Sequence, residues 1–113
     1  MALSHANSGD VVEIRPPGTR IGDSPSTAIV RDGHIEVMRL LLPAGKSLPE
    51  HAVAGPMTLH CMEGVIDVRT DDTSRPMRAG ELMYLAGGAA HSVHAIEDSF
   101  VLATLVRLPQ ATA

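Results

Sequence analysis

Histidine is the residue type in this sequence with the widest scope for chemistry. The 113-residue chain has six histidines and a single cysteine, Cys61. An imidazole titrates near neutral pH and binds transition metals in its neutral form, so the histidines could serve acid–base chemistry or a metal site. A lone cysteine excludes an internal disulfide and a zinc site built from several thiolates. No glycine-rich loop leads into a helix, so nucleotide-binding motifs are absent.

The composition narrows the classes of partner. Hydrophobic residues make up 44% of the chain, yet there is one Tyr, one Phe and no Trp, so the core must consist of aliphatic side chains and methionine. So few rings cannot form a stacking platform for single-stranded nucleic acid. The net charge of −4, without any run of Lys or Arg, gives no surface that attracts a polyanion. We therefore expect no nucleic-acid partner.

The N-terminal residues indicate the compartment. Residues 1–7 have neither the basic stretch nor the apolar stretch of a signal peptide. No apolar run approaches the roughly 18 residues that a membrane-spanning helix needs. We expect a cytoplasmic protein without a membrane partner.

Turn-forming residues occur at short intervals, and apolar residues alternate with polar ones between them. Asp32-Gly33 is a strong hairpin signal between two such segments. No segment has the period of an amphipathic helix, so the pattern predicts an all-β domain of nine or ten strands. Strands are expected at residues 11–14, 27–31, 35–42, 47–53, 57–62, 65–70, 76–78, 81–85, 91–96 and 100–107. The expected divisions are an N-terminal tail with a short edge strand (1–26), a barrel (27–107) and a C-terminal tail (108–113).

Several expected strands are apolar on both faces, although a solitary barrel would have one solvated face. Leu40, Leu41 and Leu42 fill both sides of their strand, and Met62 adds an apolar group to the outer side of another. A second layer must therefore cover the outer face. In a chain of this length a second copy is the simplest source, so we predict a homodimer. The alternative is that the terminal segments supply the cover.

Two groups of residues resemble the two sequence motifs of the cupins. The first is Gly45-(five residues)-His51-x-Val53-(three residues)-Met57-(six residues)-Gly64. The second is Gly80-(five residues)-Ala86-x-Gly88-x-x-His91. The spacing fits without a gap, and the resemblance spans roughly residues 27 to 107. It implies an RmlC-like cupin jelly-roll barrel, a double-stranded β-helix with one interior pocket.

The resemblance also implies which residues occupy the positions of metal ligands. In metal-bearing cupins three histidines and one carboxylate point into the pocket, and ligands at alternate residues share one face of a strand. Carried over onto this sequence, the first and last ligand positions fall on His51 and His91. Val53 stands where the second histidine would be, and Met57 where the carboxylate would be. The implied metal ligands are therefore His51 and His91 alone.

The implied pocket is mostly apolar with two polar groups, which is the usual character of a small-ligand site. Its expected lining is His51, Val53, Met57, Leu59 and His91. Two imidazoles are fewer ligands than zinc or non-haem iron usually takes. A weakly held Zn, Ni, Cu or Fe completed by water is compatible with this set, and so is a pocket without metal.

Two further histidines are expected on the outer face of the barrel. His60 is three residues from Met57, and His94 is three residues from His91. Because successive side chains of a strand point to opposite faces, both should face outward if their partners face inward.

Three functions are compatible with these residues. The first is a stand-alone cupin that binds a small molecule in the barrel, with or without a transition metal. The second is a metal-dependent oxygenase or isomerase of small molecules, as found among relatives, which the incomplete ligand set disfavours. The third is a sensor that acts with a separate regulatory partner. No catalytic residue is assigned, because function depends on the site and not on the barrel.

Overall fold

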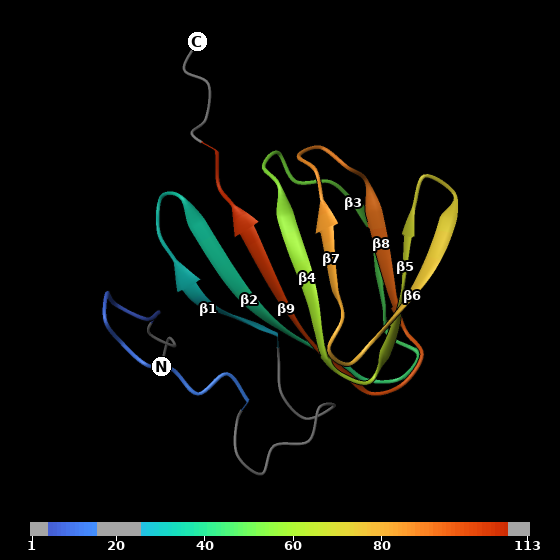
Figure 1. The fold of residues 1–113 in the computed structure, drawn as a ribbon, viewed down its shortest axis with the longest axis horizontal. Helices are drawn as coiled ribbons and strands as arrows, with labels where there is room; N and C mark the ends of the chain where they lie inside the picture. The colour runs from blue at the N-terminus through green and yellow to red at the C-terminus, as the bar shows by residue number, and fades with distance from the viewer. Residues whose placement is uncertain (1–4, 16–25, 109–113) are drawn as a thin grey trace.

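The computed structural model describes residues 5–15 and 26–108, which contain nine β-strands and no helix (Figure 1). The all-β expectation is confirmed. The described part of the chain accordingly offers no helix long and apolar enough to cross a membrane. The predicted tails fall partly on residues 1–4, 16–25 and 109–113, which lie outside the described residues.

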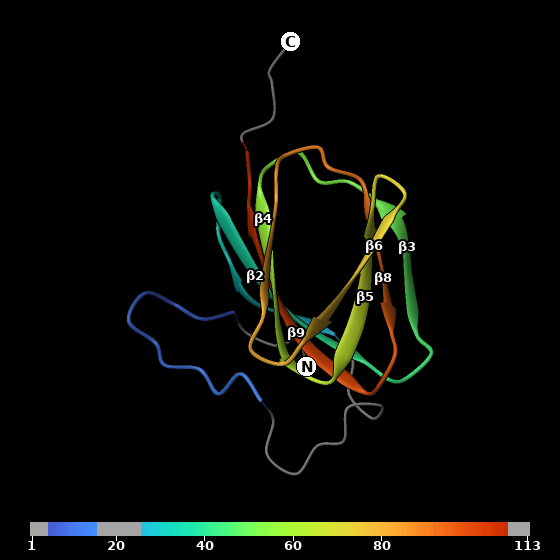
Figure 2. The same ribbon diagram turned by 45° about the vertical axis from the view of Figure 1, so that its right-hand side comes forward.

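The strands form two antiparallel sheets that face each other (Figure 2). In order across the five-stranded sheet, the strands are β1 (Thr27–Arg31), β2 (Ile35–Leu42), β9 (Ser99–Val106), β4 (Met57–Glu63) and β7 (Leu82–Leu85). In order across the four-stranded sheet, they are β3 (Ser47–His51), β8 (His91–Ala95), β5 (Val65–Thr70) and β6 (Thr73–Arg78). Strands distant in sequence thus lie side by side, such as β4 with β9 and β3 with β8.

The core lies between the two sheets and is built from alternate residues of the strands. Leu59 and Cys61 come from the five-stranded sheet, and Ile66 and Val68 from the four-stranded sheet, each at most 2% exposed. The buried cluster that contains them holds only aliphatic and sulfur-bearing side chains, as the composition requires. Burial of one large aliphatic side chain contributes about 2 kcal/mol, so this cluster is the main source of stability.

The hairpin predicted at Asp32-Gly33 joins β1 to β2. The Asp32 carboxylate accepts hydrogen bonds from the backbone N–H groups of His34 (2.7 Å) and Ile35 (2.9 Å). These bonds stabilise the charged form and lower the pKa of Asp32 below its usual value. The turn is therefore fixed by the aspartate side chain as well as by the strands.

One expected strand is absent and another begins three residues earlier than expected, while the other limits agree to within two residues. Residues 11–14 form no strand, and Arg39 Nη1 instead donates to the carbonyl oxygen of Ile14 at 2.6 Å. Strand β6 begins at Thr73 and not at residue 76, because Asp71 and Asp72 alone make the turn. Both aspartates have positive φ, 46° and 65°, as a tight two-residue hairpin requires.

Candidate functional site

The structure places His51 and His91 in contact. His51 ends β3, His91 begins β8, and the two residues are paired across these neighbouring strands. Their ring centroids lie 4.5 Å apart, with the ring planes inclined by 54°. We call these two residues the histidine pair. One bound group can touch both rings at this separation.

A local irregularity in β3 gives His51 its position. The pairing register between β3 and β8 shifts between Leu48 and His51, which marks a bulge. Pro49 lies within this bulge, and β3 is the edge strand of its sheet, where a residue without an N–H group is tolerated. A bulge redirects the side chains that follow it, and here it brings His51 alongside His91.

The backbone fixes which nitrogen each imidazole presents to a ligand. His51 Nδ1 lies 3.2 Å from the carbonyl oxygen of Pro49, and His91 Nδ1 lies 3.1 Å from that of Ala89. A carbonyl oxygen only accepts, so each Nδ1 must carry the proton and donate it. In the neutral rings both Nε2 atoms therefore keep a free lone pair. The histidine pair can accept hydrogen bonds or coordinate an ion through Nε2.

The two rings differ in exposure. His91 is a fully buried residue, only 2% exposed, whereas His51 is exposed. The pair thus consists of one ring inside the barrel and one ring at its rim.

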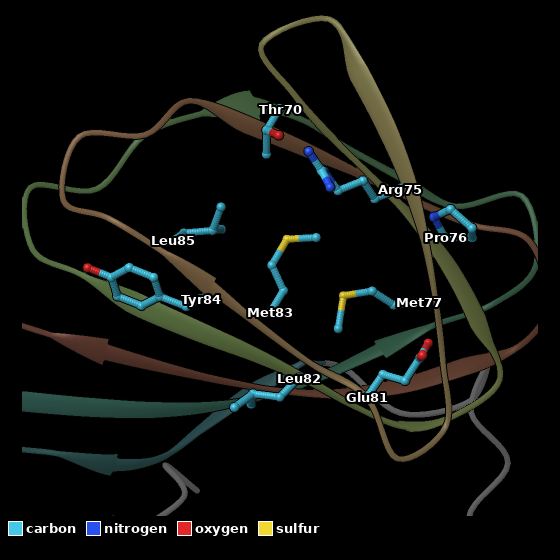
Figure 3. A pocket seen from close by; sticks show the side chains of 9 residues that line it. All are labelled: Thr70, Arg75, Pro76, Met77, Glu81, Leu82, Met83, Tyr84 and Leu85. Carbon is cyan, nitrogen blue, oxygen red and sulfur yellow. The ribbon is translucent and has the colours of Figure 1, made fainter.

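An open cleft of about 650 Å³ lies between the edges of the two sheets, where β6 of one sheet faces β7 of the other (Figure 3). We call it the β6–β7 cleft. Its lining residues are Thr70, Arg75, Pro76, Met77, Glu81, Leu82, Met83, Tyr84 and Leu85. Figure 3 shows the side chains of Met77, Met83 and Arg75 pointing into the cleft.

Thr70 connects the cleft to the histidine pair. It lines the cleft and is also the cross-strand partner of His91 in the pairing of β5 with β8. Directly paired residues project from the same face of a sheet, about 5 Å apart at Cβ. Neither histidine lines the cleft itself, so Thr70 is the residue through which the histidine pair and the β6–β7 cleft adjoin.

The other predicted pocket residues belong to the packed interior. Met57 and Leu59 are 6% and 2% exposed and are members of the core cluster. Their strand partners on β7, Leu85 and Met83, line the cleft beside them. Val53 follows β3 and is partly buried against the core. None of these three predicted pocket residues lines the cleft itself.

The remaining reactive side chains lie elsewhere. His94 is exposed and its Nδ1 lies 2.7 Å from Ser47 Oγ, while His60 is half-buried. Cys61 is completely buried, and this burial, together with the negative charge of Glu81, raises the pKa of its thiol. Cys61 is therefore inert at neutral pH.

The donor set does not fit a metal centre of three or four protein ligands. Nowhere in residues 5–15 and 26–108 do three His, Cys, Asp or Glu side chains gather closely enough to hold one ion. Structural and catalytic zinc sites take at least three protein ligands, and non-haem iron takes two histidines and a carboxylate. The histidine pair supplies two, so any ion here would depend on water or on a bound molecule for its other positions.

Arg75 is a residue of the cleft that the sequence pattern did not reveal. The turn was expected at residues 71–74 and the strand at 76–78, so Arg75 fell between them and no face could be assigned to it. In the structure Arg75 lies on β6, two residues before the buried Met77, and so shares its inward face. The alternation of Thr73, Arg75 and Met77 is the signal that could have revealed it.

Comparison with solved structures identifies the architecture. An RmlC-like cupin from Methanocaldococcus jannaschii with a double-stranded β-helix fold matches with a TM-score of 0.75 at 14% identity, covering 90% of this chain and 94% of that one. An RmlC-like cupin from Desulfovibrio desulfuricans matches with a TM-score of 0.71 at 21% identity, covering 90% and 97%. A Streptococcus pyogenes protein of unknown function matches with a TM-score of 0.73 at 17% identity, covering 97% of this chain and 99% of that one.

This chain has the cupin fold. No protein-family profile and no curated protein sequence matches it, so the resemblance read from the two motifs is supported by structure and not by overall sequence similarity. In this cupin barrel the first and last motif histidines adjoin each other, as described above. The intervening motif positions hold Val53 and Met57, which have no role as hard ligands.

Proposed function

We propose that this protein binds a small organic molecule where the histidine pair adjoins the β6–β7 cleft. The observation that carries the proposal is the contact between the two imidazoles, 4.5 Å apart, beside an open cleft of about 650 Å³. That volume is within the roughly 300–1,000 Å³ of small-molecule sites. Both Nε2 atoms are available to accept hydrogen bonds from a ligand, since Nδ1 is occupied in each ring.

The donor set favours a binding module over a metal-dependent oxygenase or isomerase. Two imidazoles would hold Zn, Ni, Cu or Fe weakly, with water in the other positions. Elemental analysis of untagged protein, purified without added metal, should therefore give well under one transition-metal ion per chain. A metal content near one per chain that disappears in His51→Ala would contradict this expectation and favour the metal-dependent enzyme.

Binding can be tested with two probes of equal length, neutral hexanamide and anionic hexanoate. In a titration followed by NMR of the histidine rings, at least one probe should shift the resonances of His51 and His91 and leave that of His94 unchanged. His51→Ala should weaken binding several-fold, because it removes an exposed acceptor without disturbing the core. His94→Ala is the matched control. If neither probe moved the His51 or His91 resonance at its solubility limit, small-molecule binding at this site would be disproved.

A further inference from the structure

We infer that the ligand carries a carboxylate group and that Arg75 binds it. This inference rests on the proposed function and adds the chemical class of the ligand. It begins from the position of Arg75 on the inward face of β6, beside the buried Met77. Arg75 itself is exposed, so its guanidinium is open to the cleft and to solvent, whereas the buried cluster of the barrel interior holds only aliphatic and sulfur-bearing side chains.

The guanidinium of Arg75 has no partner among the described residues. The ion pairs there join Arg15 to Glu63 and Arg31 to Glu36, and no hydrogen bond of the Arg75 side chain occurs in the same part of the chain. Glu81 also lines the cleft, but its Oε1 accepts from the backbone N–H of Arg78 at 2.7 Å. Among the lining residues Arg75 is the one cation and Glu81 the one anion, and Figure 3 shows Arg75 nearer to Thr70, so an anion would bind at that end of the cleft.

The neighbours of Arg75 suit a carboxylate with an apolar remainder. Figure 3 shows the guanidinium directed into the cleft toward Thr70, whose hydroxyl is on the same side. A guanidinium matches the two oxygens of a carboxylate, and the hydroxyl offers a further donor. Met77, Met83 and Leu85 line the rest of the cleft and would contact a hydrocarbon chain. The carboxylate would be held by Arg75 and Thr70, and a separate hydrogen-bond donor on the ligand would reach the Nε2 atoms of the histidine pair, because Thr70 is paired with His91.

The test compares hexanoate with hexanamide, which differ in charge and not in chain length. Hexanoate should bind about three- to fivefold more tightly to the unaltered protein, because Arg75 is exposed and solvent weakens its ion pair with a carboxylate. The preference should shrink as salt is raised, because the cleft is open to solvent. Arg75→Gln should abolish the preference, and Arg75→Lys should retain part of it.

Arg78→Gln is the matched control, because Arg78 lies on the same strand with the opposite orientation and is exposed. This control should bind hexanoate as the unaltered protein does, and the melting temperatures of the variants show that each is folded. Equal affinity for the two probes, or hexanoate binding that Arg75→Gln leaves unchanged, would overturn the carboxylate assignment. In either case shifts of the His51 and His91 resonances would leave the proposed function standing. Failure of both probes would remove both proposals.

Discussion

At the scale of single residues, hydrogen bonding to the backbone decides what each histidine can do. The Nδ1 atoms of His51 and His91 each lie against the carbonyl oxygen two residues earlier in the chain, that of Pro49 or Ala89, whereas Nδ1 of His94 lies against a serine hydroxyl on the outer face. His51 and His91 therefore have Nε2 free for a ligand, whereas His94 is exposed to solvent on the outer face. Cys61 is the opposite case, a potentially reactive group removed from solvent altogether.

The buried thiol gives a prediction at this scale. Cys61 should react with iodoacetamide at pH 8 more than about tenfold more slowly in the folded protein than in urea, because burial raises its pKa and access requires local opening. The rate should rise only at a pH well above that at which an unfolded thiol ionises. Mass spectrometry of timed samples measures it. Equal rates in folded and unfolded protein would contradict the burial of Cys61.

At the scale of elements, the turns determine how the site residues meet. The strand β7 is followed by a loop that packs on residues 53–55, where Gly88 N–H donates to the Val53 carbonyl at 2.8 Å. An ideal Cβ on Gly87 would lie 2.4 Å from the carbonyl oxygen of Ala54, so only glycine permits this approach. His91 follows this loop directly, and the loop therefore sets the start of β8.

Substitution at this loop tests its role. Gly87→Ala should cost about 1–3 kcal/mol through overpacking, which corresponds to a fall of roughly 5–15 °C in Tm. Gly33→Ala is the control, since no atom lies within 4 Å of its ideal Cβ, and it should change stability by less than about 0.5 kcal/mol. Thermal unfolding followed by circular dichroism measures both. The same Tm for the two variants would show that residues 53–55 move to accommodate the added methyl group and that the close approach at Gly87 is not required.

The sequence allowed most elements to be predicted, because alternation and turn residues coincide. Strands β1, β2 and β5 match their expected limits, and the spacing of the two motifs anticipated that His51 and His91 belong together. The start of β6 was wrong because Asp71-Asp72-Thr73-Ser74 contains four turn-favouring residues, and only the pairing with β5 shows that two suffice. The cleft was missed for a related reason, since its walls come from the edges of separate sheets, which no local pattern reveals.

At the scale of the whole molecule, part of the outer face of the five-stranded sheet is covered and part is not. Residues 5–15 contact β1 and β2: Ala6 N–H donates to the carbonyl of Ile29 on the edge strand β1, and Arg39 Nη1 on β2 donates to the carbonyl of Ile14. Leu82 and Tyr84 on β7 stay 64% and 67% exposed. The tail thus supplies some of the cover that the sequence called for, and the prediction of a second copy applies to the β7 end.

The homodimer can be tested directly on that surface. We expect light scattering after size exclusion to give the mass of two chains, and the double variant Leu82→Asp, Tyr84→Asp to give the mass of one, because buried charges oppose association. Ile96→Asp, at an exposed residue beyond β8, is the control and should stay dimeric. Since Tyr84 is the only tyrosine and there is no tryptophan, its emission should also change on dilution. A single-chain mass for the unaltered protein would refute the dimer.

The way the two sheets meet at the cleft has a consequence for selectivity. Within residues 26–108 no backbone ladder joins β6 to β7, and the turn between them is held to β4 by reciprocal bonds of Gly80 and Glu81 with Cys61. One end of this seam is thus anchored while the other can spread without breaking a strand pairing. A longer or bulkier ligand could be accommodated by such spreading. The proposed contact with Arg75, in contrast, requires a negatively charged group on the ligand. The site should accordingly select strictly for the charged group of a ligand and tolerate variation in the length and bulk of its hydrocarbon part.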